Sequence, residues 1–354
     1  MLPLTCEPPN EQNPPTQKVW IVFGATGHMG RALVRSALTH GDRVTAVGWT
    51  QEHGREELSK WQGKNVQWML CDVRIRESVE KVIRESVERW GRVDVIANCV
   101  GFGVIGACED QDECELRNQF DVNFFGTLHI IQLSLPYFRA RQAGRYLIFS
   151  STSGALGVPG LGPYCATKYA VEGLIESMLY EVDCYNIKAS LVEPGHVRRD
   201  EPEPPAGEVR SPGDHAIQLA PLPKRFQQFK VKAASPPYAG ANAPAGHAKR
   251  MLQWLNDRQP TSAVKSAELV WQLGHCSYPP LRLLLGSFAV ESIRDRLRSI
   301  TEEIEDWKHL HFPAELGGRS DGHELEESGG GMDEGGREEE DEGEQDEEMK
   351  EEGD

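Results

Sequence analysis

Short apolar runs alternate along the chain with longer segments of helical period. Lys18–Phe23 is a continuous apolar run, typical of a strand buried on both faces of a sheet. After it, helices are expected at 29–38, 77–90, 111–139 and 163–185, and strands at 43–47, 66–70, 93–97, 146–150 and 188–192. Strands joined by helical crossovers predict an α/β fold, a doubly wound parallel sheet with helices on both faces.

The pattern changes after Gly195. Between residues 198 and 260 the chain has ten prolines and few apolar residues, and such a segment inside a domain is typical of a lid, here about 196–260. A helix at 263–273, a strand at 280–285 and a helix at 288–310 follow. We therefore expect a single domain over residues 18–317. It follows a disordered lead-in at 1–17, which has five prolines and no hydrophobic periodicity.

The formal net charge of the 354 residues is −17, and it is unevenly distributed. Asp321–Asp354 contains 18 acidic and two basic residues, a net charge of −16, so residues 1–320 together carry −1. We expect residues 318–354 to be a disordered acidic tail, either a solvated extension, which is favoured, or a binding segment for basic partners. A body without a basic excess is not expected to bind nucleic acid.

The eight cysteines form no CxxC pair and no Cys/His cluster, so no metal site is expected. The N-terminus has no basic flank followed by an apolar core, and no apolar run approaches the roughly 20 residues that span a bilayer. These features predict a cytoplasmic protein without a transmembrane segment.

The first strand leads into a glycine-rich turn, Gly24-Ala25-Thr26-Gly27-His28-Met29-Gly30. Glycines permit a tight turn and a close approach to a pyrophosphate, and the helix that follows directs unpaired N–H groups at the phosphates. This context predicts a dinucleotide-binding site. The second strand ends at Val47-Gly48-Trp49 without a carboxylate for the adenosine ribose, which favours NADP(H) and leaves NAD(H) as the alternative. Arg31 and Arg55 are candidate partners of the extra phosphate.

Tyr164 and Lys168 lie four residues apart in an expected helix, which places them on one face, one turn apart. A phenol with its usual pKa of about 10 exchanges protons poorly near neutral pH, and a neighbouring ammonium is expected to lower that pKa. Ser150 and Ser151 end the preceding strand, where side chains open onto the carboxyl edge of the sheet. Together these residues indicate acid–base chemistry at that edge.

Four more motifs occur in order: Asp72-Val73 after the third strand, Asn98-Cys99-Val100-Gly101 after the fourth, Asn123 within DVNFFG, and Pro194-Gly195-His196-Val197 after the sixth. With the glycine turn and the Tyr164/Lys168 pair, they resemble the short-chain dehydrogenase/reductase family over about residues 18–200 and 262–310. The resemblance implies a Rossmann fold and an oxidoreductase that interconverts an alcohol and a carbonyl with a nicotinamide cofactor.

The resemblance also implies roles for individual residues. Tyr164 would be the general acid/base, Lys168 would lower its pKa and hold the nicotinamide ribose, Ser151 would bind the substrate oxygen, and Asn123 would hold a water of the proton relay. The residues expected to bind the cofactor are Gly24, Thr26, Gly27, His28, Met29, Gly30, Trp49, Asp72, Val73, Asn98, Gly101, Tyr164, Lys168, Pro194, Gly195 and Val197. Arg199 stands where relatives often have a threonine that contacts the nicotinamide carboxamide.

Within the family, YCATKYAVEGLIESM and LVEPG most resemble retinol and hydroxysteroid dehydrogenases, which implies a small, hydrophobic alcohol or ketone as substrate. His196, Phe226, Phe229 and Tyr238 either line the substrate pocket or only anchor the lid. Two other functions stay open: a non-catalytic nucleotide-binding module that uses its tail for partners, and an epimerase or dehydratase of the extended branch, whose glycine spacing this turn approaches. The resemblance further implies a homodimer or homotetramer formed through the long helices.

Overall fold

The computed structural model describes residues 4–49, 63–198, 228–240, 242–244, 246–247, 250 and 261–310. Its main elements are β1 (Val19–Phe23), α1 (His28–Thr39), β2 (Arg43–Gly48), β3 (Val66–Leu70), α3 (Arg76–Trp90), β4 (Val95–Asn98), β5 (Gly103–Ile105), α4 (Glu113–Phe120), α5 (Gly126–Arg141), β6 (Gly144–Phe149), α6 (Gly162–Val182), β7 (Ile187–Pro194), β8 (Val197–Arg198), β9 (Phe229–Val231), β10 (Thr261–Ser262), α8 (Ala263–His275), β11 (Arg282–Leu285) and α9 (Ser287–Asp306).

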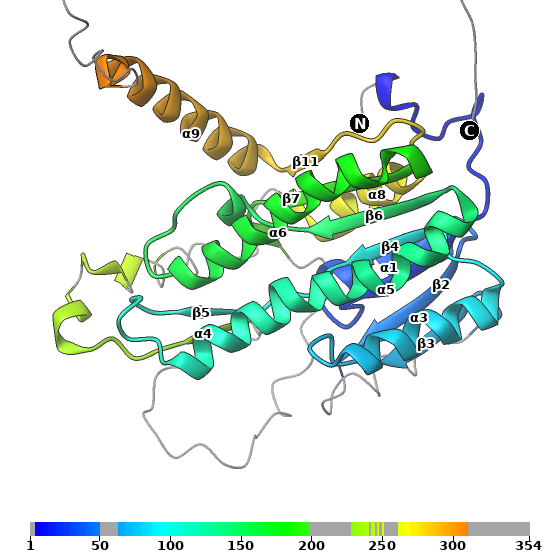
Figure 1. Ribbon diagram of the computed structural model, residues 1–354, viewed down its shortest axis with the longest axis horizontal. Coiled ribbons are helices and arrows are strands. Elements are labelled where there is room, and N and C mark those ends of the chain that lie inside the picture. The colour runs from blue at the N-terminus through cyan, green and yellow to red at the C-terminus, as the bar shows by residue number, and fades with distance from the viewer. Residues whose placement is uncertain are drawn as a thin grey trace, which may run out of the picture. The chain divides into compact units, whose positions relative to one another are not determined.

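Seven strands form one parallel sheet in the order β11-β7-β6-β4-β1-β2-β3 (Figure 1). The order reverses at β1, which pairs with β2 on one side and with β4 on the other. Ligands of doubly wound folds bind at such a reversal, outside the carboxyl ends of the strands. The strand ends at 23, 98, 149 and 194 therefore define where a site is expected.

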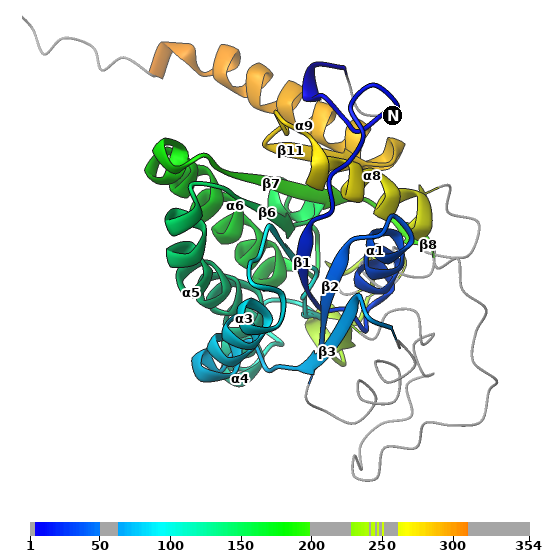
Figure 2. The ribbon, with the colours of Figure 1, turned by 90° about the vertical axis from the view of Figure 1, so that its right-hand side faces the viewer.

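The apolar run of β1 serves two cores, one on each face of the sheet. Trp20 and Val22 belong to the core that α1 and α8 cover, whereas Ile21 and Phe23 belong to the core that α3, α5 and α6 cover. All four side chains are fully buried. Figure 2 shows these helices on opposite faces of the sheet. The predicted α/β fold, a doubly wound Rossmann sheet with helices on both faces, is confirmed.

The long helix expected at 111–139 is interrupted. α4 ends at Phe120, the five residues Asp121–Phe125 form a π-helical turn, and α5 continues from Gly126. Such a turn inserts an extra residue into the helical ladder and is frequent at functional sites. Sequence periodicity does not reveal it, because the apolar spacing on either side is that of an ordinary helix.

Two short parallel pairs join segments that are far apart in sequence. β5 pairs with β9, and β8 pairs with β10. β8 and β10 bring the two borders of the expected lid, residues 196–260, together, and β9 attaches its middle to β5. Residues 199–227 and most of 241–260 lie outside the described residues, and so do Arg199 and Phe226.

The lead-in differs from the expectation of disorder. Leu4–Cys6 form a short 3-10 turn, Cys6 is buried in the core beside α1 and α8, and the Tyr278 amide lies 3.5 Å from the Cys6 carbonyl oxygen. At its other end, Gln17 Nε2 donates to the Gly41 carbonyl at 2.7 Å. The described part of the lead-in is thus held against the domain, because its one buried thiol completes a core made by later residues.

The chain divides into two units, residues 1–303 and residues 304–354, and of the second the structure describes 304–310. The expected end of the domain at 317 and the acidic tail lie outside the described residues. Among the described helices, none combines the length and apolar character that crossing a membrane requires.

Candidate active site

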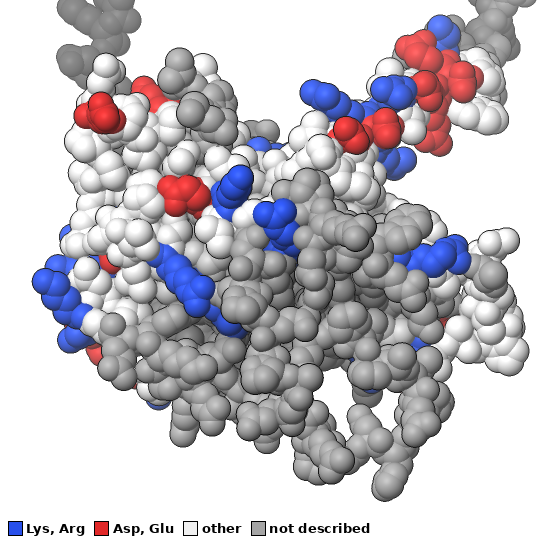
Figure 3. All heavy atoms as spheres, turned by 180° about the vertical axis from the view of Figure 1, so that it is seen from behind, with Lys and Arg blue, Asp and Glu red and all other residues white. Residues whose placement is uncertain are grey.

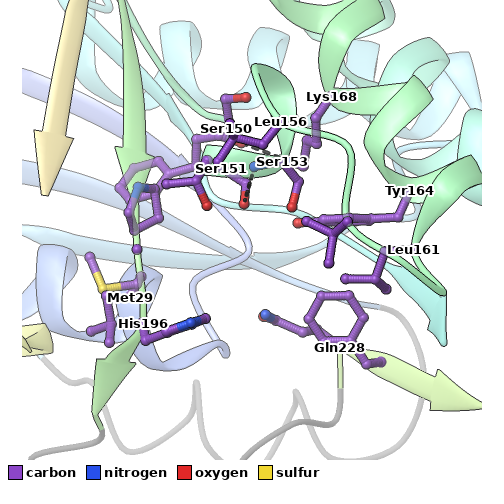
Figure 4. Close-up of a pocket in the computed structure, with 18 of the residues that line it drawn as sticks. Met29, Ser150, Ser151, Ser153, Leu156, Leu161, Tyr164, Lys168, His196 and Gln228 are labelled. Atoms are coloured by element: carbon purple, nitrogen blue, oxygen red, sulfur yellow. Dashed lines mark hydrogen bonds between the residues drawn. The ribbon is translucent and has the colours of Figure 1, made fainter. Parts of the chain in front are cut away.

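A cavity of about 410 Å³ opens at the carboxyl edge of the sheet (Figure 4). It brings the glycine turn, the end of β6, the start of α6 and the end of β7 to one place. The predicted site residues that line it are Gly27, His28, Met29, Gly30, Gly101, Ser151, Tyr164, Lys168, Pro194, Gly195 and Val197. Residues from 27 to 197 of the chain therefore share a single cavity.

The glycine turn has the geometry that a bound phosphate needs. Gly24 has a φ of +77°, and a Cβ there would lie 2.9 Å from the Cys99 carbonyl carbon, so only glycine fits. The N-cap of α1, Gly27, has an extended conformation and offers no side chain as a cap. The Gly27 residue thus adds no side chain between the start of α1 and a ligand, and an anion at the N-terminus of a helix is stabilised.

Ser151, Tyr164 and Lys168 form the polar side of the cavity. The Ser151 hydroxyl is hydrogen-bonded with the Tyr164 phenol, which points towards it in Figure 4. Lys168 Nζ donates to the Phe149 carbonyl oxygen at 2.9 Å and lies 5.7 Å from the centre of the Tyr164 ring. The predicted one-turn spacing thus brings the Lys168 ammonium over the Tyr164 ring, while the Ser151 hydroxyl is hydrogen-bonded to the phenol oxygen.

The pKa values differ from the expectation for this pair. Burial raises the pKa of Tyr164, and its hydrogen bond with Ser151 opposes that rise only in part. Burial also lowers the pKa of Lys168 to about 8, although the Glu172 carboxylate acts against it. Desolvation dominates over the Lys168 charge in the protein alone, so Tyr164 is a neutral phenol at neutral pH.

Asn123 and Asn98 lie outside the cavity lining, and their buried side chains form hydrogen bonds that link neighbouring elements. Asn123 Nδ2 donates to the Phe102 carbonyl at 2.8 Å and to Thr167 Oγ1 at 2.9 Å, and its Oδ1 accepts from the Phe102 amide at 2.8 Å. Asn98 Nδ2 donates to Thr127 Oγ1 at 2.9 Å. Both side-chain N–H groups of Asn123 are therefore in use within the protein, and the relay water expected at this residue stays a prediction.

Asn98 and Asn123 belong to one series of hydrogen bonds that extends to α6. Thr127 Oγ1 donates to the Asn123 carbonyl at 2.6 Å, and Thr167 Oγ1 donates to the Tyr164 carbonyl at 2.7 Å. The end of β4, the π-helical turn and the first turns of α6 are therefore linked through buried threonines. Sequence reasoning missed Thr127 and Thr167, and their only signal was their place within the motifs.

Trp49, Asp72 and Val73 lie at the ends of β2 and β3, away from the cavity lining. The guanidinium of Arg74 lies 2.5 Å from Asp72 Oδ2 and holds the pKa of that carboxyl below its usual value, and Trp49 hydrogen-bonds with the same carboxyl. Arg31 Nη2 donates a hydrogen bond to the Thr26 carbonyl oxygen at 2.9 Å. These residues are placed beside the glycine turn rather than with Tyr164.

The described ends of the lid add apolar side chains to the cavity. The Phe229 ring packs edge-to-face on Tyr164 with centroids 5.1 Å apart, and His196 stacks on Phe288 at 4.3 Å. Both expected pocket residues therefore line the cavity, whereas Tyr238 is bound to Glu109 away from it. Lining residues that the sequence did not single out are Leu156, Val158, Leu161, Gln228 and His247.

An ionic cluster of two buried and two exposed charged side chains lies next to the end of β6. Ser150 Oγ donates to Glu172 Oε1 at 2.5 Å, and Arg282 of β11 bonds to Glu172, Glu176 and Glu193. Glu193 Oε2 is buried without a partner. Burial and the Glu172 charge raise the pKa of Glu193 to about 7. This cluster connects the strand that carries Ser151 with the last strand of the sheet.

Comparisons with known proteins agree with this arrangement. The model of the short chain dehydrogenase family matches residues 18–202. An oxidoreductase of Botryotinia fuckeliana, BOA17, is 28% identical over 293 residues, which cover 83% of this chain and 97% of the relative. A 3-ketodihydrosphingosine reductase of Bacteroides thetaiotaomicron is 32% identical over 178 residues, which cover 50% of this chain and 63% of the relative.

Among solved structures, a short-chain dehydrogenase from Streptomyces avermitilis superposes with a TM-score of 0.70 at 28% identity, covering 84% of this chain and 97% of that one. The family match spans the glycine turn, the Ser151 strand end and the Tyr164/Lys168 helix, all of which meet in the cavity. The chain belongs to the short-chain dehydrogenase/reductase family, a family of oxidoreductases.

Proposed function

We propose that this protein interconverts a hydrophobic alcohol and its carbonyl compound with NADP(H), and that Tyr164 moves the proton. The observation that carries the proposal is the single cavity in which the hydrogen-bonded Ser151 and Tyr164 face the N-terminus of α1. A nicotinamide dinucleotide fits this arrangement, since its pyrophosphate needs the uncapped helix end and its reactive ring must reach the Tyr164 side of the same cavity.

The cofactor, when bound, supplies the hydride. The protein's own residues supply the proton and the orientation. In the reducing direction the substrate oxygen accepts hydrogen bonds from Ser151 and Tyr164. As that oxygen gains negative charge, the neutral phenol donates its proton to it and becomes a phenolate. The nearby Lys168 ammonium stabilises the phenolate, and solvent returns the proton; oxidation runs the same steps in reverse.

The substrate class is proposed from the cavity wall. Leu156, Val158, Leu161, Phe229 and Phe288 present apolar side chains to the cavity that contains Tyr164. Apolar walls with a few convergent polar groups select hydrophobic ligands and fix their orientation. The similarity to a 3-ketodihydrosphingosine reductase, a reductase of a keto substrate, points the same way.

The central test is Tyr164→Phe, which removes one oxygen and keeps the ring that packs on Phe229. We expect turnover of a carbonyl panel, followed by NADPH absorbance, to fall by at least about 100-fold, the usual range for a lost general acid. NADPH binding, measured by fluorescence, should stay within about threefold. The matched control is Tyr180→Phe on the same helix, where the side chain is 90% exposed, and it should retain full activity.

Two outcomes would replace the proposal. NADPH binding without turnover of any alcohol or carbonyl would support the non-catalytic module. A tightly retained NAD that is not consumed would support the epimerase or dehydratase. Turnover that survives in Tyr164→Phe would contradict the assignment of Tyr164 as the proton donor.

The NADP preference has its own test. β2 ends at Gly48, followed by Trp49, so no carboxylate at the strand end repels a 2′-phosphate. Placing one there, as Trp49→Asp, should shift the ratio of kcat/KM for NADPH over NADH towards NADH by at least about tenfold, since repulsion of this kind is worth 1 to 2 kcal/mol. Trp49→Asn introduces a side chain of the size of aspartate without its charge. An equal shift of the kcat/KM ratio in that variant would contradict the electrostatic explanation.

A further inference from the structure

α9 carries an apolar stripe that the described part of the protein leaves open. Val290, Ile293, Leu297, Ile300 and Ile304 follow one another at spacings of three and four residues, which places them on one face of the helix. Only Ala289 in the first turn is buried. Leu297 is 59% exposed and Ile304 49%. Val290, Ile293 and Ile300 are half-buried. An apolar stripe that the described residues cover only in part is typical of a binding surface.

The charges on α9 are divided along its length. Residues 288–300 hold three arginines, Arg294, Arg296 and Arg298, against two acidic residues, Glu291 and Asp295, a net charge of +1, whereas residues 302–306 hold four acidic residues and no basic one, a net charge of −4. Figure 3 shows blue and red side chains together along the first part of the helix and mostly red ones towards its other end. A parallel copy of this helix would bring like charges together, and an antiparallel copy brings opposite charges together.

We propose that α9 pairs antiparallel with α9 of a second copy of this chain. With the two-fold axis between Leu297 and Ile300, Leu297 of each copy packs against Ile300 of the other. In the same register, Ile293 packs against Ile304. Five apolar positions with spacings of three and four form the seam of such a pair. The interface is isologous and closes on two copies.

This register places Arg296 beside the seam, opposite Glu303 of the second copy, and repeats the pair on the other side of the two-fold axis. Arg298 lies on the outer side of the helix and faces solvent. The surface differs from the long helices α5 and α6, through which the resemblance implied an oligomer. Residues 290–304 of α9 are absent from the cavity lining, so the proposal does not depend on the reaction proposed for the cavity.

The test is the mass of the full chain in solution, measured by sedimentation velocity over a range of concentrations. Leu297→Asp should halve the mass found for the wild type, and its far-ultraviolet circular dichroism should show that it remains folded. Arg296→Glu should raise the dimer dissociation constant at least about tenfold. Arg296→Glu combined with Glu303→Arg should restore it, because the pair re-forms with its charges exchanged.

Arg298→Glu is the matched control, with the same charge change on the outer side of the helix, and it should leave the mass unchanged. A wild type that stays monomeric at every concentration would overturn the proposal. So would a Leu297→Asp variant with the wild-type mass, which would assign the interface to another surface. Failure of the double charge exchange to restore the association would rule out the antiparallel register.

Discussion

At the end of β7, Glu193 is 1% exposed, and its two carboxylate oxygens have unequal surroundings. Oε1 accepts from Arg282 at 2.6 Å, whereas Oε2 has no partner. The titratable groups that face it are Glu172 and Glu176 from α6 and Arg282 from β11. Burial and the Glu172 charge outweigh Arg282 and raise the pKa of Glu193 from 4.5 to about 7. Between pH 4.5 and about 7, the folded protein therefore keeps a proton on Glu193 that the unfolded chain has lost.

The raised pKa has a consequence for stability at different pH. The folded state binds the proton of Glu193 more tightly than the unfolded state does. The resulting contribution to the free energy of unfolding is complete below pH 4.5 and is lost as the pH rises through about 7. Glu193→Gln keeps the shape and removes the titration. We expect the melting temperature of this variant to exceed that of the wild type at pH 8 by about 2–4 °C, the effect of roughly 1 kcal/mol in a chain of this size. At pH 5 the two should melt alike.

The control for this prediction is Glu88→Gln on α3, where the side chain is 65% exposed and bound only to Arg84. It should leave the difference between pH 5 and pH 8 unchanged. A wild type and a Glu193→Gln variant with parallel pH profiles would show that Glu193 titrates normally.

Single residues also show how far sequence reasoning reaches. The types and spacing of Ser151, Tyr164 and Lys168 predicted that they would meet, and they line one cavity. Their pKa values were not predictable, because these depend on how completely the fold removes water from Tyr164. Asn123 was predicted to hold a water, and this stays a prediction; the hydrogen bonds of its side chain with Phe102 and Thr167 were not predictable, because they join residues far apart in sequence.

At the scale of elements, Asp42 joins β1, β2 and α8. It is 1% exposed at the end of the sheet opposite the cavity. Its Oδ2 accepts from Trp20 Nε1, Trp271 Nε1 and His275 Nε2, each at 2.9 Å, and its Oδ1 accepts from the Lys18 amide at 2.8 Å. One carboxylate thus satisfies four donors. A carboxylate is needed because every partner donates, and an amide would turn an N–H group towards them.

Asp42→Asn should therefore destabilise the protein by about 1–3 kcal/mol, since at least one buried donor loses its acceptor and the others exchange a charged acceptor for a neutral one. The measurement is chemical denaturation followed by tryptophan fluorescence, with activity assayed at low temperature, where it should persist because the cavity lies at the opposite edge. Asp183→Asn, at an exposed position after α6, is the control and should change the free energy of unfolding by less than about 0.5 kcal/mol. Equal stability of Asp42→Asn and the wild type would contradict this account.

The elements that periodicity predicted are those with their own apolar pattern. Each strand of the seven-stranded sheet was expected within a few residues of where it lies. The pairing of β5 with β9 was not expected, because these strands are three residues long and separated by more than 120 residues. Nor was the burial of Cys6, since the core that receives it is made by α1 and α8. Contacts between distant short segments leave no local signal.

For the whole molecule, charge and chemistry are separated along the chain. The described residues that line the cavity all lie between Gly27 and Phe288, whereas −16 of the net charge of −17 lies in residues 321–354. The proposed proton transfer uses Ser151, Tyr164 and Lys168 and requires none of the acidic residues in 321–354. Its field on the cavity is screened over about 8 Å at physiological ionic strength. The acidic pI of about 5.2 is thus a property of the tail and not of the site.

A chain ending at Gly318 should consequently keep kcat and KM within about twofold of the full chain at 0.15 M salt, although its net charge is close to zero. Because it retains α9, it should also sediment as an assembly of the same number of copies as the full chain, which separates the tail from the proposed helix pairing. The comparison should be repeated at low salt, where a longer screening length would reveal a field effect on KM for the anionic cofactor. A loss of kcat at both salt concentrations would make the tail part of the catalytic machinery, and a change confined to low salt would assign it a purely electrostatic influence on cofactor binding.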